Sequence, residues 1–115
     1  MIEKIIIDYL IAQDIPGVGT NVFAEVPETP PERYITVRRA GGSITNMIRG
    51  ANIVTEATSR ISLLDAAEIH EAVIAALLEI RDFTELYSCR LNSDYNATRP
   101  NTKEYAYQAL WQAYM

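Results

Sequence analysis

One stretch, residues 62–81, limits the possible folds more than any other part of the chain. Ser62 is followed three residues later by Asp65, a spacing at which an acidic side chain can reach back to the amide that starts a helix. Apolar residues then recur at helical spacing and share one arc: Leu63, Ala66, Ala67, His70, Val73, Ile74, Leu77 and Leu78. We expect this long central helix to cover one face of a sheet.

Alternating segments on both sides of this helix predict the strands. Residues 33–39 and 52–61 have the strongest strand character, because they alternate and are rich in β-branched side chains. Weaker strands are predicted at 21–26, at 83–91 and over the last twelve residues, where a helix is also possible. With a short N-terminal helix at 2–13, the order is α-β-β-β-α-β-β. We predict an α+β fold with a mixed or antiparallel sheet of about five strands.

Two connecting segments leave alternatives open. The stretch from Gly41 to Gly50 is bounded by glycines and reads either as a mobile loop or as a long hairpin arm. Residues 92–102 are polar and predict a loop, so the pairing of the last two strands is left open.

The size and composition of the chain predict one soluble domain. The chain has 115 residues, and we expect residues 1–115 to form a single domain with one hydrophobic core. No apolar run approaches the ~20 residues that span a membrane. The N-terminus lacks the features of a secretory signal, and the single cysteine, Cys89, suits a reducing cytoplasm.

Charge is segregated along the chain. Residues 1–32 hold six acidic side chains against one lysine, residues 33–60 hold five arginines against one glutamate, and residues 61–82 hold five acidic side chains against one arginine. This pattern permits head-to-tail contact between copies, although ordinary solvated charges would give the same pattern.

The sequence contains no recognisable catalytic set, cofactor motif or metal site. His70 is the only histidine and Cys89 the only cysteine, and both are expected on apolar faces as structural residues. Glu68 and Glu71, with Asp65 before them, could share a divalent ion or act as acid and base, but they fit a solvated helix face better. We therefore expect no enzyme activity.

Two groups of residues are candidates for contact with partners. Arg38, Arg39 and Arg49 could bind phosphates or the carboxylates of a neighbouring subunit. Ile7 and Ile11 form a second apolar strip on the N-terminal helix. Either this helix is buried on two sides within the monomer, or the strip meets another subunit.

The arrangement of segments resembles a known family. A short first helix, a Pro-rich turn leading to Arg33-Tyr34-Ile35-Thr36-Val37, a strand ending in Ser59-Arg60 and the helix containing Ala66-Ala67-Glu68-Ile69-His70-Glu71-Ala72-Val73 are similar to the tail terminator proteins of long-tailed bacteriophages. These are also called tail completion or tail-to-head joining proteins. The similarity lies in order and spacing over most of the chain; the polar tract 92–102 departs from the family pattern.

The resemblance implies a virion protein at the head–tail junction, assembled in the cytoplasm of the bacterial host. Its copies would form a ring, typically of six, on the end of the tail tube. The ring would contact the tail tube protein and the head-connector or head-completion protein, and DNA would pass through its lumen without sequence-specific binding. The loop from Gly41 to Gly50 would match the family's mobile loop, making Met47, Ile48 and Arg49 candidate contacts.

Two other functions are compatible with the sequence. A cytoplasmic binding or regulatory module could recognise an acidic partner or nucleic acid through Arg38, Arg39 and Arg49. A small enzyme would have to use Glu68, Glu71 or His70.

Overall fold

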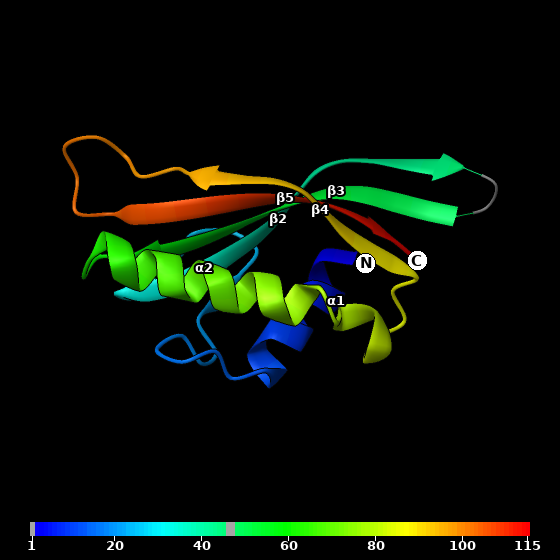
Figure 1. Cartoon of the computed structure of the whole chain (residues 1–115), viewed down its shortest axis with the longest axis horizontal. Coiled ribbons are helices and arrows are strands. Elements are labelled where there is room, and N and C mark those ends of the chain that lie inside the picture. Colours follow the sequence, from blue (N-terminus) through cyan, green and yellow to red (C-terminus); the bar gives the residue numbers. More distant parts are fainter. Residues whose placement is uncertain (1, 46–47) are drawn as a thin grey trace.

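The computed structural model describes residues 2–45 and 48–115, which form one sheet and two α-helices (Figure 1). The elements, in chain order, are α1 (Ile2–Ala12), β1 (Val22–Phe23), β2 (Arg33–Thr45), β3 (Ile48–Ser59), α2 (Leu63–Leu77), the 3-10 helix η1 (Ile80–Asp82), β4 (Ser88–Asn96) and β5 (Tyr105–Tyr114). This order confirms the predicted α+β fold.

The five strands form a mixed sheet in the order β1-β2-β3-β5-β4. The two-residue β1 runs parallel to β2, and every other neighbouring pair is antiparallel. The pairing that the sequence left open is thereby settled: β5 is an interior strand and lies between β3 and the edge strand β4.

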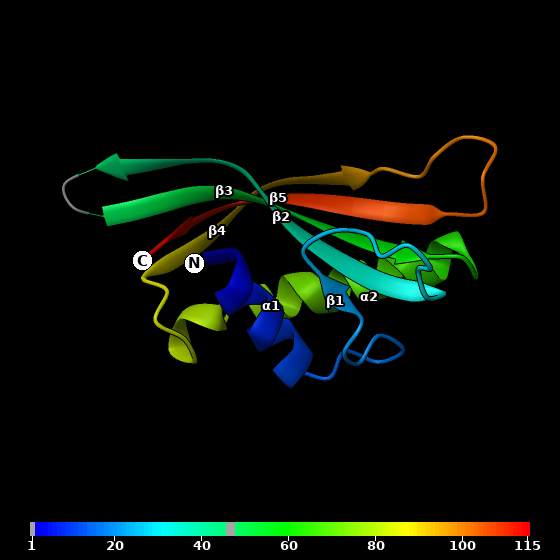
Figure 2. The same cartoon turned by 180° about the vertical axis from the view of Figure 1, so that it is seen from behind.

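Both helices cover the same face of the sheet, as the two opposite views show (Figures 1 and 2). The core fills the space between them and the strands, and Ile6, Ile35, Leu77 and Trp111 are fully buried there. Complete burial of one such side chain contributes about 1.5–3 kcal/mol relative to exposure. In residues 2–45 and 48–115, no helix covers the opposite face of the sheet.

Helix α2 starts at the predicted place and ends earlier, but the Asp65 carboxylate binds Arg33 and Ser59 in place of the predicted contact with the first amide of the helix. The Ser62 hydroxyl accepts a hydrogen bond from the Asp65 amide at 3.0 Å, as an N-cap side chain does. The helix ends at Leu77, and η1 follows.

The buried face of α2 is rotated from the predicted arc. Ile69 is buried, whereas Leu63 and Leu78 are 40% and 60% exposed. Ile69 faces Ile15 and Pro16 across a small pocket, and the Tyr9 hydroxyl of α1 donates to the Ala76 carbonyl at 2.8 Å, so this side of α2 has a second neighbour besides the sheet. The sequence pattern of one helix could not include this second neighbour.

Two predicted strands need correction. The strand predicted at 21–26 contains only Val22–Phe23. The strand predicted at 83–91 begins only at Ser88, and it continues to Asn96 through half of the tract that was predicted as a polar loop. Because β4 is an edge strand whose last residues are exposed, it needs no continuous apolar alternation.

The segment after residue 40 is a hairpin arm, which decides between the two sequence alternatives. Strands β2 and β3 stay paired from Arg33↔Ser59 to Thr45↔Ile48, with a bulge between Arg39 and Gly41. The arm extends beyond the two helices (Figure 1). Met47 lies outside the described residues, and only the strand backbone is described for Ile48 and Arg49.

In the described residues, no helix combines the length and the apolar character needed to cross a membrane.

Candidate interaction surface

A groove between α1 and β2 brings together three of the residues that the sequence singled out. Ile7, Arg38 and Arg39 line it, and its volume is about 460 Å³. The remaining lining residues are Glu3, Lys4, Ala24 and Val37. The groove lies beside the outer side of β2, which is the side that β1 covers only at Ile35 and Thr36.

The groove is predominantly cationic. Lys4, Arg38 and Arg39 contribute three positive charges against the single carboxylate of Glu3, and both arginines are exposed. Lys4 also pairs with Asp8 at 2.6 Å in an exposed i,i+4 contact. One oxygen of Glu3 is buried without a hydrogen-bond partner.

The apolar strip of α1 is only partly exposed. Ile7 and Ile11 are half-buried and pack against the core, so α1 is covered on more than one side within the monomer. Of the two, only Ile7 also lines the groove. The structure therefore joins Ile7 to the arginine pair and leaves Ile11 outside the groove.

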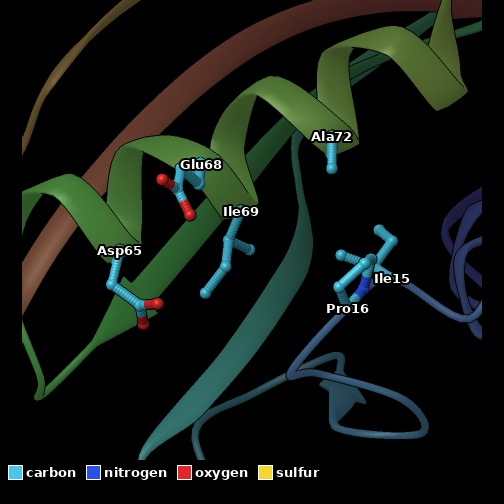
Figure 3. A pocket seen from close by; sticks show the side chains of 6 residues that line it. All are labelled: Ile15, Pro16, Asp65, Glu68, Ile69 and Ala72. Carbon is cyan, nitrogen blue, oxygen red and sulfur yellow. The ribbon is translucent and has the colours of Figure 1, made fainter.

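The acidic residues of α2 do not converge on a reactive site. Asp65 and Glu68 line a pocket of about 170 Å³ against Ile15 and Pro16 (Figure 3). Glu71 is exposed and does not line this pocket. Across the described residues, no three His, Cys, Asp or Glu side chains gather in a way that could hold a metal ion.

Asp65 is already engaged in a structural contact. Its carboxylate accepts hydrogen bonds from Arg33 Nε at 2.7 Å and from the Ser59 hydroxyl at 2.6 Å. The Arg33 hydrogen bond, assisted by that of Ser59, holds the pKa of Asp65 below its usual range. This cluster ties the start of β2 and the end of β3 to the first turn of α2.

His70 and Cys89 both lie on the helix-covered side of the sheet. His70 is buried, with Nε2 3.0 Å from an Asp94 carboxylate oxygen, and its ring stacks on Tyr107 at a centroid distance of 5.4 Å. Burial raises the pKa of the Cys89 thiol to about 11, so the thiol is protonated at neutral pH and is a poor nucleophile.

A charged group on the helix-free face escaped the sequence analysis. Glu56 of β3 is only 7% exposed, and its carboxylate accepts hydrogen bonds from Gln108 of β5 and from Arg99 of the β4–β5 loop. Arg99 also pairs with Glu104 at 3.2 Å. These contacts fasten the loop across the sheet. The only sequence signal was a glutamate within a strongly alternating strand.

No protein-family profile matches the sequence, and no curated protein matches it. A solved structure does match in three dimensions. It is a protein chain in the virion of a native gene transfer agent particle. The TM-score is 0.65 at 16% identity, and the match covers 91% of this chain and 83% of that chain. The two proteins share a fold.

Proposed function

We infer that this chain is a structural protein of a phage-like virion, and that it acts as a tail terminator. The observation that carries the proposal is the fold shared over 91% of the chain with a protein of a gene transfer agent virion. The order of segments, which resembles the tail terminators, supports the same assignment independently of that comparison.

In this role the chain works by assembly and carries out no reaction. Copies form a ring, of six in the family it resembles, on the end of a tail tube; the tail tube protein lies on one side and a head-completion protein on the other. The protonated Cys89 thiol and the His70 ring held by Asp94 fit structural roles. The exposed Arg38 and Arg39 beside the groove provide a binding surface.

The proposal is tested with the purified chain and with tail tubes assembled from the tail tube protein of the same phage-like particle. Electron microscopy should show a ring at one tube end, and tube elongation should stop when the chain is added. The paired variant Arg38→Glu, Arg39→Glu should bind less well, whereas Arg81→Glu, which changes an exposed arginine elsewhere, serves as the matched control. Tubes that stay uncapped and continue to elongate at a saturating excess of chain would refute the assignment.

The cationic groove favours one alternative, a binding module for an acidic partner. Fluorescence anisotropy with duplex DNA and with an acidic peptide would measure this directly. Binding that falls steeply with salt and disappears in the Arg38→Ala, Arg39→Ala variant, in a protein that ignores tail tubes, would support the alternative.

A further inference from the structure

Both outer edges of the sheet have uncovered strand segments, and the two uncovered segments are similar in length. On one side, β1 pairs with β2 only at Ile35 and Thr36, so no described strand covers the outer edge of β2 from Arg38 to Thr45. On the other side, β4 is the last strand of the sheet, and no described strand covers its outer edge from Ser88 to Asn96. Uncovered edges of this length present unpaired amides and carbonyls that can template pairing with another chain.

The strand directions make the two edges suitable partners. Strands β2, β3, β5 and β4 alternate in direction across the sheet. If β4 of one copy lies beside β2 of the next copy in the same orientation, the alternation continues and the new pair is antiparallel. Antiparallel pairing is slightly more stable per residue than parallel pairing. A second copy of this chain can therefore extend the sheet without any change of fold.

The free part of β2 also lies level with β4. Following the register across the sheet, Arg38 pairs with Val54, Val54 with Leu110, and Leu110 with Ser93. The residues level with the covered positions Ile35 and Thr36 belong to the end of β4, at Tyr95 and Asn96. Pairing without an offset thus places Ser88–Ser93 of one copy along the free edge of the next.

The backbone groups point in the required direction. The Ile35 amide donates outward, to the Asn21 carbonyl at 2.9 Å. Because alternate residues of a strand point to the same side, the Arg39 amide also points outward. The Ala97 amide donates inward, to the Ala106 carbonyl at 2.8 Å. The amide directions alternate along β4 from Ala97, with one interruption at the bulge between Leu91 and Ser93. The Leu91 amide therefore points outward, at the level of Arg39.

The charges at the two edges are mixed. The side that carries the β2 edge has Lys4, Arg38 and Arg39 around the groove. The side that carries the β4 edge has Asp94, whose side chain is 45% exposed. On the helix-covered face, Asp94 of one copy would lie diagonally across the new strand pair from Arg39 of its neighbour, at a distance that the guanidinium can span. On the helix-free face, the exposed Arg90 of β4 would lie level with Gly41 and diagonal to Arg38, so this pair of like charges opposes the contact that Asp94 and Arg39 favour.

We propose that copies of this chain join head to tail by pairing the outer edge of β4 in one copy with the free edge of β2, from Arg38 onward, in the next. The contact is heterologous, because each copy pairs its β4 edge with one neighbour and its β2 edge with the other. Heterologous contacts close into rings when the rotation between successive copies allows it. The inference rests on the proposed ring. It adds the surface and the backbone hydrogen bonds by which the ring is made.

A cysteine pair tests the contact directly. In a Cys89→Ala background, Arg38→Cys and Ser93→Cys place one thiol on each edge at positions that face each other as a non-hydrogen-bonded pair, where Cβ atoms are close enough for a disulfide. Mild oxidation of the assembled double variant, at high concentration or on tail tubes, should give a ladder of covalent multimers on a denaturing gel. Each single variant should give no ladder. Efficient dimers from Arg38→Cys alone would indicate a symmetric contact and overturn the proposal.

A second pair of variants separates the backbone from the charge. Arg39→Pro removes the outward amide at a bulge, where proline is tolerated, whereas Arg39→Thr keeps the amide and removes the same charge. We expect self-association by analytical ultracentrifugation to weaken at least tenfold more in Arg39→Pro than in Arg39→Thr, while both remain folded by circular dichroism. Equal association of the two would overturn the strand pairing.

The outcomes also separate this inference from the proposed function. Rings that form the cysteine ladder but ignore tail tubes would refute the tail terminator role and leave the edge pairing standing. Capped tubes without a ladder, and with equal association of the two Arg39 variants, would refute the edge pairing and leave the role standing. A chain that stays monomeric at all concentrations and forms no ring on tail tubes would overturn both the edge pairing and the tail terminator role.

Discussion

A single buried hydrogen bond in the middle of the sheet gives the sharpest test of what holds this fold together. The Trp111 indole N–H donates to the Thr55 hydroxyl at 3.0 Å, and the two side chains are 0% and 1% exposed. Thr55→Val keeps the shape of the side chain and removes the acceptor. The indole N–H then stays buried without a partner, which costs about 1–3 kcal/mol.

A double-mutant cycle isolates this term from the loss of the hydroxyl itself. Trp111→Phe removes the donor, so in that background Thr55→Val should cost close to nothing or be slightly stabilising, because a buried hydroxyl is then exchanged for a methyl group. The expected coupling between the two sites is at least about 1 kcal/mol.

Urea unfolding followed by far-UV circular dichroism measures all four proteins of the cycle without using tryptophan fluorescence. With a slope of about 1–3 kcal/mol/M, a loss of 2 kcal/mol moves the midpoint by about 1 M. A Thr55→Val cost that is the same with Trp111 and with Phe at that position would refute the reasoning.

Three further predictions follow from other contacts. Because Arg33 and Ser59 lower the pKa of Asp65, the stability that this carboxylate provides is fully present above its unfolded pKa of about 3.9 and is lost as pH falls through the lowered native pKa. Thermal unfolding from pH 5 to 2 should therefore show a steeper decline for the wild type than for Asp65→Asn, and parallel curves would contradict it. The Cys89 thiol, with a pKa of about 11, should react with iodoacetamide at pH 8 much more slowly in the native protein than in urea, and equal rates by mass spectrometry would show that the thiol is not protected. Ser62→Ala should lower the free energy of unfolding by about 1 kcal/mol through loss of the cap on the Asp65 amide, whereas Ser62→Asp should preserve it; no difference between the two in urea would argue against the cap.

The sequence predicted the parts of the fold that depend on local pattern. The cap at Ser62, the strong strand from Arg33 and the alternation of β3 all describe what neighbouring residues do, and the structure has each of them. The bounds of strand β4 were predicted wrongly because β4 is an edge strand that pairs only with β5. Its exposed residues can be polar, so they carry no alternating apolar pattern.

The interaction surface was only half predictable. Composition identified Arg38 and Arg39, but their meeting with Ile7 depends on α1 packing beside β2, which no local pattern encodes. Glu56 was missed for the same reason, because its partners Arg99 and Gln108 lie 43 and 52 residues away in the sequence.

The interior position of β5 also determines when this protein can fold during its synthesis. The ribosome makes β5 after the other four strands, yet β5 is the strand that links β3 to β4 in the sheet. Until residues 105–114 have left the exit tunnel, β3 exposes an unpaired edge, α2 has half a sheet to cover, and Trp111 is missing from the core. A nascent chain stalled before residue 105 should therefore be bound by chaperones and cleaved readily by protease, and folding should be completed only after β5 emerges.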